Sequence, residues 1–163
     1  PTLSGLAPFA GTNSGGFGAQ LGAQINIPNM PGSSLRAFVF YADGAHAYNV
    51  GSPSAIFGPT GESYYGGAEW SVLVSYNHQF SSTLGASVAF QWWNDLYYAG
   101  SDLLSGADAW GAEFSLVWFP VSDFEVRAEI HYDDVGAFNF PATPAPLDPD
   151  GTVSGYLRFT RYF

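Results

Sequence analysis

The chain has 163 residues, with four arginines and no lysine against 14 acidic residues, so its formal net charge at pH 7 is −10. This balance excludes nucleic-acid binding, because such proteins need a basic surface to neutralise phosphates. The lack of cysteine excludes disulfides, thiolate chemistry and Cys-ligated metals, and no apolar run is long enough for a transmembrane helix.

The amino-terminal part of the chain predicts a loop followed by two strands. Residues 1–14 are rich in Gly, Pro and Ser, which favour loops. Residues 17–27 then alternate between apolar side chains and Gly, Gln or Asn, and residues 35–41 alternate in the same way after a short turn. This period of two indicates a β-strand with one apolar and one polar face. A long loop is expected at 43–63.

Five further strands are predicted in the rest of the chain, at residues 68–77, 84–93, 110–119, 124–132 and 153–163. Short turns follow the first and third of these five, whereas the loops at 94–108 and 133–151 are long. The apolar stripes last about nine residues, the length that a tilted strand needs to cross a hydrocarbon layer. Alternating short and long connections are typical of a transmembrane β-barrel, whose two rims face different compartments.

Aromatic side chains bracket the apolar stripes, as expected for the two interfacial girdles of a membrane barrel. The predicted girdle consists of Tyr41, Trp70, Tyr76, Trp92, Trp110, Trp118, Phe124 and Tyr132. The opposite faces carry Gly, Ser, Gln, Asn and a few charges, and nine of the 14 acidic residues fall in the three long loops. Because lipid demands an uncharged outer face, we interpret residues 1–163 as a single all-β domain, an antiparallel transmembrane β-barrel.

A soluble carbohydrate-binding β-sandwich is the alternative interpretation. The aromatic stripes would then form its core, and Trp92, Trp93 and Tyr97 would form a platform on which sugars stack. A sandwich usually shows water a Lys- and Glu-rich exterior and has shorter strands, of about five or six residues. The composition and strand lengths therefore favour the barrel.

Seven strands do not close a bacterial barrel. If the short turns are periplasmic, the first strand enters from outside, whereas bacterial single-chain barrels have an even number of strands and begin in the periplasm. An open edge in lipid would leave backbone N–H and C=O groups unpaired, at a cost of several kcal/mol each. The chain is therefore expected to be the C-terminal portion of a longer polypeptide, or to be completed by another chain.

Two segments near the end of the chain resemble a known family. The ending G-T-V-S-G-Y-L-R-F-T-R-Y-F (151–163) and the hairpin W-F-P-V-S-D-F-E-V-R-A-E-I-H-Y (118–132) are similar to the closing strands of alphaproteobacterial general porins. The resemblance implies a sixteen-stranded barrel, of which this chain would supply strands 10 to 16, assembled as a homotrimer in the bacterial outer membrane. It also implies a water-filled channel for passive diffusion of small hydrophilic solutes and ions. The terminal Phe163 would be the signal that the barrel-assembly machinery reads.

Such porins narrow their channel with a third extracellular loop in the amino-terminal half, and this chain has no counterpart of that loop. Its own contribution is the polar face of the strands, where alternation predicts eight pore-lining side chains: Arg36, Glu69, Glu113, Glu125, Arg127, Glu129, His131 and Arg158. Three of these, Glu125, Arg127 and Glu129, lie two residues apart and are expected to pair. The structural interpretation is a salt-bridged, solvated wall, and the functional one is tuning of ion passage. Because the set is weakly negative, a preference for cations is expected.

The acidic loops are expected to be solvated, and no cofactor is otherwise expected. A sharper hypothesis is that their aspartates bind Ca²⁺ at the outer rim and bridge the protein to lipopolysaccharide phosphates. An enzyme is not expected, because His46, His78 and His131 are far apart in sequence and no Ser or Cys lies in a nucleophile motif. Glu113 and Glu125 superficially suit a glycosidase carboxylate pair, but any two inward glutamates on neighbouring strands would do so.

Overall fold

The computed structural model describes residues 16–43, 65–98, 104–137 and 150–163. Its strands are β1 (Phe17–Asn26), β2 (Ser34–Asp43), β3 (Tyr65–Gln79), β4 (Leu84–Tyr98), β5 (Ala109–Val121), β6 (Phe124–Val135) and β7 (Thr152–Arg161). All seven form one antiparallel sheet in the order β1 to β7, and the sheet is not closed. The predicted all-β antiparallel architecture is confirmed. In the part of the chain that the structure describes, no helix is long and apolar enough to cross a membrane.

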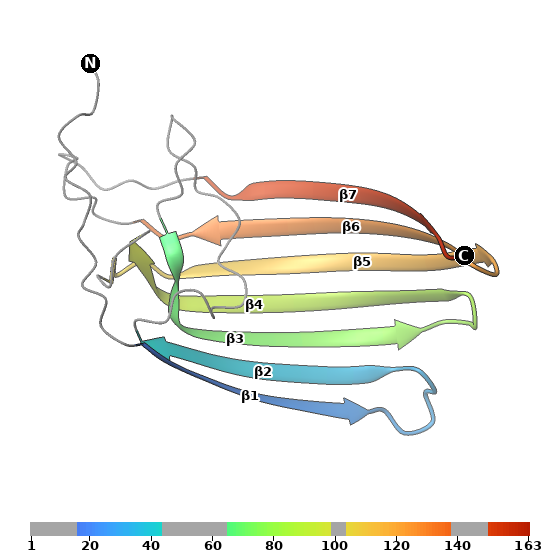
Figure 1. The fold of residues 1–163 in the computed structure, drawn as a ribbon, viewed down its shortest axis with the longest axis horizontal. Helices are drawn as coiled ribbons and strands as arrows, with labels where there is room; N and C mark the ends of the chain where they lie inside the picture. The colour runs from blue at the N-terminus through green and yellow to red at the C-terminus, as the bar shows by residue number, and fades with distance from the viewer. Residues whose placement is uncertain (1–15, 44–64, 99–103, 138–149) are drawn as a thin grey trace, which may run out of the picture.

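The two ends of the sheet differ in their connections, as Figure 1 shows. Short turns join β1 to β2, β3 to β4 and β5 to β6 at one end, where the carboxyl terminus also lies. We term this end the short-turn rim. The connections that follow β2, β4 and β6 leave from the opposite end, which we term the long-loop rim.

The cross-strand register places large apolar side chains on one face of the whole sheet. One row across it consists of Leu21, Val39, Val72, Trp92 and Trp110, each paired with the next. Side chains on this face stay exposed despite their size; Leu21 is 77% exposed, Phe114 46% and Leu157 62%. An apolar surface of this extent indicates a face that contacts something other than water.

The β-sandwich alternative is wrong for the described chain. A sandwich core would lie between two sheets, whereas all seven strands belong to one sheet. Trp110 and Phe114, which such a core would bury, are exposed. Trp92 and Trp93 point to opposite faces because they are adjacent in β4. Trp93 and Tyr97 are buried, so the three side chains form no sugar platform.

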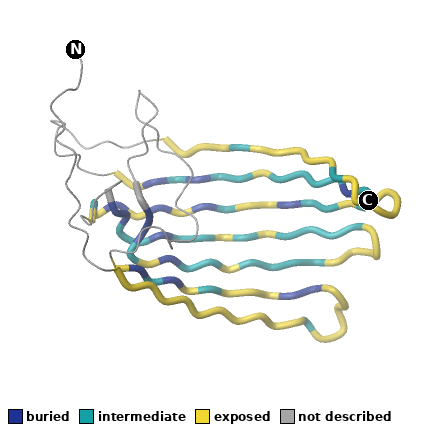
Figure 2. Tube along the Cα trace, in the orientation of Figure 1, coloured by how far each residue is buried: buried dark blue, intermediate teal, exposed yellow. Residues whose placement is uncertain are grey.

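The best-packed region lies at the long-loop rim, where Figure 2 shows buried segments on several neighbouring strands. Leu96 in β4 is fully buried. Its N–H donates to the Ala107 carbonyl and its carbonyl accepts from the Ser105 N–H, both at 2.8 Å. The Tyr97 hydroxyl donates to the Ala42 carbonyl at 3.2 Å and so ties β4 to β2. These contacts tie the ends of neighbouring strands together at this rim.

The strands extend further toward the long-loop rim than predicted. β3 begins at Tyr65, β4 continues to Tyr98 and β6 to Val135, so the loops expected at 94–108 and 133–151 begin later. Four of the acidic residues assigned to loops therefore lie on strands: Asp43, Asp95, Asp133 and Asp134. Asp95 in β4 adopts a φ of 50°, and the pairing with β3 keeps its register across it, from Trp70–Asn94 to Ala68–Leu96. A polar run at the end of a strand resembles a loop in sequence, although backbone pairing continues through it.

The turn between β5 and β6 depends on Asp123, whose φ is 64°. This left-handed region costs most L-residues roughly 1–2 kcal/mol, but Gly, Asn and Asp tolerate it. We expect Asp123→Gly to leave the stability of the folded protein unchanged or higher, and Asp123→Val to lower it by about 1–2 kcal/mol. Urea unfolding in detergent micelles measures both changes, and equal stabilities of the two variants would contradict the expectation.

Candidate functional site

The eight ionisable residues predicted to line a pore all lie on strands, on the face opposite the exposed apolar one. Three of them share one row across the sheet. Arg36 in β2 pairs with Ser75, which pairs with Ala89; Ala89 pairs with Glu113, which pairs with His131. Residues that are distant in sequence thus line a common polar surface.

β6 carries five ionisable side chains two residues apart, which we term the charge ladder: Glu125, Arg127, Glu129, His131 and Asp133. Arg127 Nε lies 3.0 Å from Glu125 Oε1, and Arg127 Nη1 lies 3.5 Å from Glu129 Oε1. His131 Nδ1 lies 3.0 Å from Asp133 Oδ2. The ion pairs expected along this strand are present, because alternate residues of a strand share a face.

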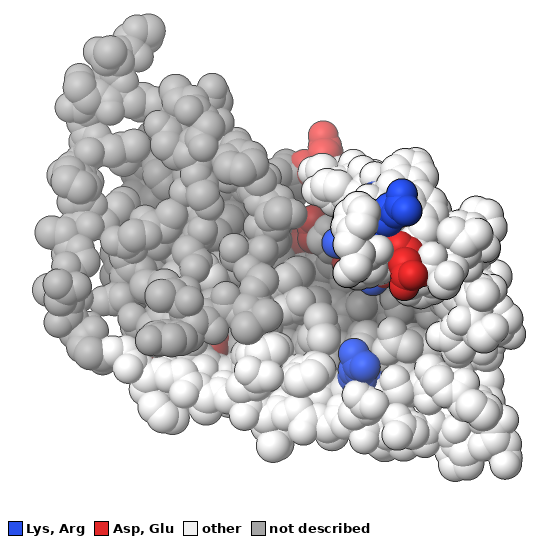
Figure 3. Space-filling view, turned by 45° about the vertical axis from the view of Figure 1, so that its right-hand side comes forward, with Lys and Arg blue, Asp and Glu red and all other residues white. Residues whose placement is uncertain are grey.

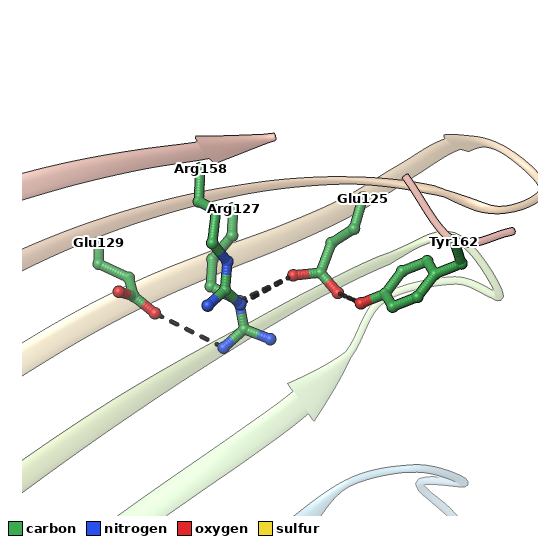
Figure 4. Close-up of polar contacts among 5 residues, drawn as sticks. All are labelled: Glu125, Arg127, Glu129, Arg158 and Tyr162. Carbon is green, nitrogen blue, oxygen red and sulfur yellow. Dashed lines mark hydrogen bonds and ion pairs between the residues drawn. The ribbon is translucent and has the colours of Figure 1, made fainter. Parts of the chain in front are cut away.

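Glu125 is the centre of the charged cluster in Figure 4, where side chains from β6, β7 and the residues after β7 converge. Its side chain is only 5% exposed. Oε1 accepts hydrogen bonds from Arg127 Nε at 3.0 Å and Arg158 Nη2 at 3.3 Å. The two arginines are direct cross-strand partners, an arrangement of like charges that is destabilising by itself. The Glu125 carboxylate offsets this repulsion and orients both guanidinium groups.

Tyr162, which follows β7, fastens the carboxyl end of the chain to the β5–β6 hairpin. Its N–H donates to the Asp123 carbonyl at 2.8 Å and its hydroxyl donates to Glu125 Oε2 at 2.9 Å. The second hydrogen bond raises the pKa of Tyr162 above its ordinary value, so the hydroxyl remains a donor. The terminal Phe163 is fully exposed, and the Arg161 guanidinium carbon lies 5.3 Å from its ring centre. The role of Phe163 as an assembly signal stays a prediction.

The polar face is more acidic than predicted. Asp133 pairs with Gly111 on this face, so it adds a carboxylate to the four glutamates that the alternation predicted there. Figure 3 shows most of the visible charged atoms gathered in one region of the described surface. The rest of that surface belongs mostly to uncharged residues. The cation preference inferred from the smaller set would therefore be strengthened by Asp133.

Sequence reasoning missed two residues of this site, for different reasons. Asp133 lies two residues beyond His131, and the period of two would have identified it had the strand been extended. Tyr162 lies beyond the last strand, and its partner Glu125 is 37 residues away. No local pattern signals that contact, because it depends on the pairing of β6 with β7.

The predicted girdle residues divide between the two rims. Tyr41, Trp70, Trp92, Trp110 and Tyr132 lie toward the long-loop rim, and Tyr76, Trp118 and Phe124 lie toward the short-turn rim. At the long-loop rim the ring centres of Tyr41 and Trp70 are 4.6 Å apart and those of Trp110 and Tyr132 are 5.0 Å apart. This arrangement is typical of aromatic zones at two membrane interfaces.

The structure does not bring together the two glutamates considered as a glycosidase pair. Glu113 pairs with His131, which lies six residues along β6 from Glu125, or about 20 Å at the rise of a strand. The two carboxyl groups of a glycosidase lie roughly 5–9.5 Å apart. His46 falls outside the described residues.

Metal binding by the acidic loops stays a prediction. Asp108 is among the loop aspartates that the structure describes, and its Oδ1 accepts hydrogen bonds from Asn94 Nδ2 and the Asp95 N–H, both at 3.0 Å. Among the residues described, no group of three or more His, Cys, Asp or Glu is arranged to hold a metal ion. Glu62, Asp102 and Asp148 lie outside the described residues.

An antiparallel sheet with one exposed apolar face between two aromatic zones, and a charged opposite face, defines the wall of a transmembrane β-barrel channel. A family model described as the porin subfamily matches residues 12–156. The chain therefore belongs to the porin family, whose members are membrane channel proteins. The comparison with curated proteins and that with solved structures each gave no significant match.

Proposed function

We propose that the protein is an outer-membrane porin that forms a water-filled channel for passive diffusion of small hydrophilic solutes and ions. The observation that carries this proposal is the contrast between adjacent residues of one strand. Phe114 is an exposed apolar side chain, and Glu113 beside it is an exposed charge on the other face. Burying such a charge in hydrocarbon is prohibitive, whereas an exposed aromatic face suits lipid. A boundary between bilayer and water satisfies both faces at once.

Further strands are needed to close the barrel. β1 and β7 are the edges of the described sheet, and β1 is exposed along its whole length. Hydrocarbon offers no partner for the N–H and C=O groups of an open edge, so we propose that strands from the same polypeptide or another chain complete the wall. The resemblance to general porins supports sixteen strands, a homotrimer and recognition of Phe163 by the barrel-assembly machinery.

The surplus of carboxylates on the polar face supports a preference for cations. Charged side chains lining a pore set its selectivity through Coulomb interactions with the passing ion. The paired members of the charge ladder largely neutralise one another, so acids that form no ion pair with another described residue, such as Glu113 and Glu69, contribute most of the field.

The full-length protein provides the test of this function. We expect it to be extracted from outer membranes only by detergent and to migrate differently in gels before and after boiling. In a planar bilayer it should give stepwise conductance, with a reversal potential in a salt gradient that favours cations. A protein that is soluble without detergent, or folded protein that gives no conductance steps, would contradict the proposal.

A further inference from the structure

The pairing of β6 with β7 has no tight turn to set its register. Residues 136–151 separate these two strands, whereas residues 122 and 123 alone join β5 to β6. A tight turn sets the register of a hairpin, but a connection as long as 136–151 allows the strands to slide past each other. A slide of two residues keeps every side chain on its own face, because the alternation along a strand has a period of two. The two faces of the sheet therefore exclude a slide of one residue but allow a slide of two.

The observed register places two like charges opposite each other. Arg127 pairs with Arg158, and like charges directly opposite destabilise a sheet. If β7 moved by two residues, Arg158 would lie opposite Glu125 after a slide in one direction and opposite Glu129 after a slide in the other. Direct ion pairing thus favours both neighbouring registers over the observed one. Main-chain hydrogen bonds do not discriminate between them, because every register provides such bonds. A side-chain contact must select the observed register.

Glu125 binds the end of the chain on two sides. Its direct partner is Thr160, so Arg158 and Tyr162 are its two diagonal neighbours across the strands, within reach of long and aromatic side chains. Glu125 Oε1 accepts a hydrogen bond from Arg158 Nη2 at 3.3 Å, and Oε2 accepts one from the Tyr162 hydroxyl at 2.9 Å. Figure 4 shows the carboxylate between these two groups. A slide of two residues would place one partner opposite Glu125 and the other four residues away, or about 13 Å along the strand.

We propose that Glu125 is a positioning residue that fixes the register in which β7 pairs with β6. Its carboxylate binds Arg158 and Tyr162 together only in the observed register, so a slide in either direction loses one of the two contacts. The register in turn sets the position of Arg158 along the polar face, because each slide of two residues moves it by about 7 Å. Glu125 thereby determines which residues of β6 the β7 guanidinium group faces.

Cysteine pairs on the apolar face report the register without altering the charged cluster. The chain has no cysteine of its own. Ala128 pairs with Leu157, so Ala128→Cys with Leu157→Cys reports the observed register. Ala128→Cys with Gly155→Cys, or with Phe159→Cys, reports a slide of two residues in one direction or the other. A disulfide needs Cα atoms within about 7 Å of each other, which favours the directly opposite pair over its diagonal neighbours.

Two substitutions should move β7 in opposite directions. Tyr162→Phe leaves Arg158 as the cross-strand partner of Glu125, so we expect Arg158 to move opposite Glu125 and the cross-link between positions 128 and 155 to rise about fivefold, the effect of one cross-strand pair. Glu125→Ala leaves Glu129 as the nearest carboxylate for Arg158. We therefore expect the cross-link between positions 128 and 159 to rise by a similar factor.

The measurement uses the full-length protein, oxidised in the outer membrane. Only protein that migrates as the folded form before boiling is taken, and its cross-linked peptides are quantified by mass spectrometry. Each pattern is compared with that of protein carrying the same cysteine pair and no other substitution. This comparison corrects for the loss of the ring contact between Phe159 and Phe124 in the pair that replaces Phe159. Tyr162→Phe keeps the aromatic ring and decides the question if Glu125→Ala does not fold.

Glu129→Ala is the matched control, because it removes a carboxylate from the same face of β6 whose ion pair is with Arg127 on its own strand. We expect the cross-link between positions 128 and 157 to remain dominant in this variant. Retention of the wild-type pattern by folded Tyr162→Phe or folded Glu125→Ala would overturn the proposal, and so would an equal slide in Glu129→Ala. The cross-links are read without conductance, so these results leave the proposed function unaffected.

Discussion

Replacement of Glu125 by Gln is expected to destabilise the folded barrel by about 2 kcal/mol and to shift its ion preference toward anions. The substitution keeps the shape of the side chain but removes the charge that Arg127 and Arg158 share at 3.0 and 3.3 Å. Arg158, which faces Arg127 across the strands, then loses the carboxylate that binds it, and Arg127 keeps the longer contact with Glu129, at 3.5 Å. The midpoint of urea unfolding and the reversal potential in a salt gradient measure the two effects.

Glu129→Gln is the matched control for this prediction. It removes the same charge from the same strand, but Glu129 has a longer contact with Arg127, at 3.5 Å, and is more exposed than Glu125. Exposed ion pairs contribute about 0–1 kcal/mol, so its stability change should be the smaller one, while the reversal potential moves in the same direction. Equal destabilisation by the two substitutions would show that the shared contacts of Glu125 do not stabilise the cluster.

An arginine introduced at two adjacent positions of β5 should have opposite consequences. Phe114→Arg places the charge on the apolar face near the middle of the strand, where a charge costs roughly 2–4 kcal/mol in a bilayer. We expect little of this variant to reach the outer membrane in folded form. Glu113→Arg places the same side chain on the polar face, and we expect it to fold and to shift the reversal potential toward anions.

Each of these two variants serves as the other's control, because they introduce the same residue at neighbouring positions. The amount of protein that migrates as the folded form in unboiled membrane samples measures the difference. Equal folding of both variants would mean that the two faces of the sheet do not meet different solvents. Failure of Glu113→Arg alone would reverse the assignment of the faces.

The connection between Glu125 and Tyr162 links the channel wall to the end of the chain. β7 pairs only with β6 among the described strands, and Glu125 in β6 binds Arg158 of β7 and Tyr162 beyond it. The same carboxylate therefore orders charges on the polar face and holds β7 against β6. This double role explains why its loss should alter both selectivity and stability.

Much of the fold could be predicted because alternate residues of each strand face the apolar or the polar side of the sheet. The type of each residue therefore indicates the side on which it lies. The alternation from Phe17 to Asn26, or from Trp110 to Phe119, indicates both the strand and the face of each side chain. The position of Arg36, Glu113 and Arg158 on the polar face followed from the alternation of side chains along each strand. The family resemblance in residues 151–163 agreed with this reading, and the match to the porin subfamily supports it.

The amino-acid sequence by itself thus determined the strands, their two faces and the class of membrane protein. Only the tertiary structure decided the length of the strands at the long-loop rim and the meeting of Arg127, Arg158 and Tyr162 at one carboxylate. The physical reason is that the alternation of side chains depends on each strand alone, whereas these features depend on the register between strands. Register brings together residues that are distant in the chain, as Glu125 and Tyr162 are, and no local pattern encodes it.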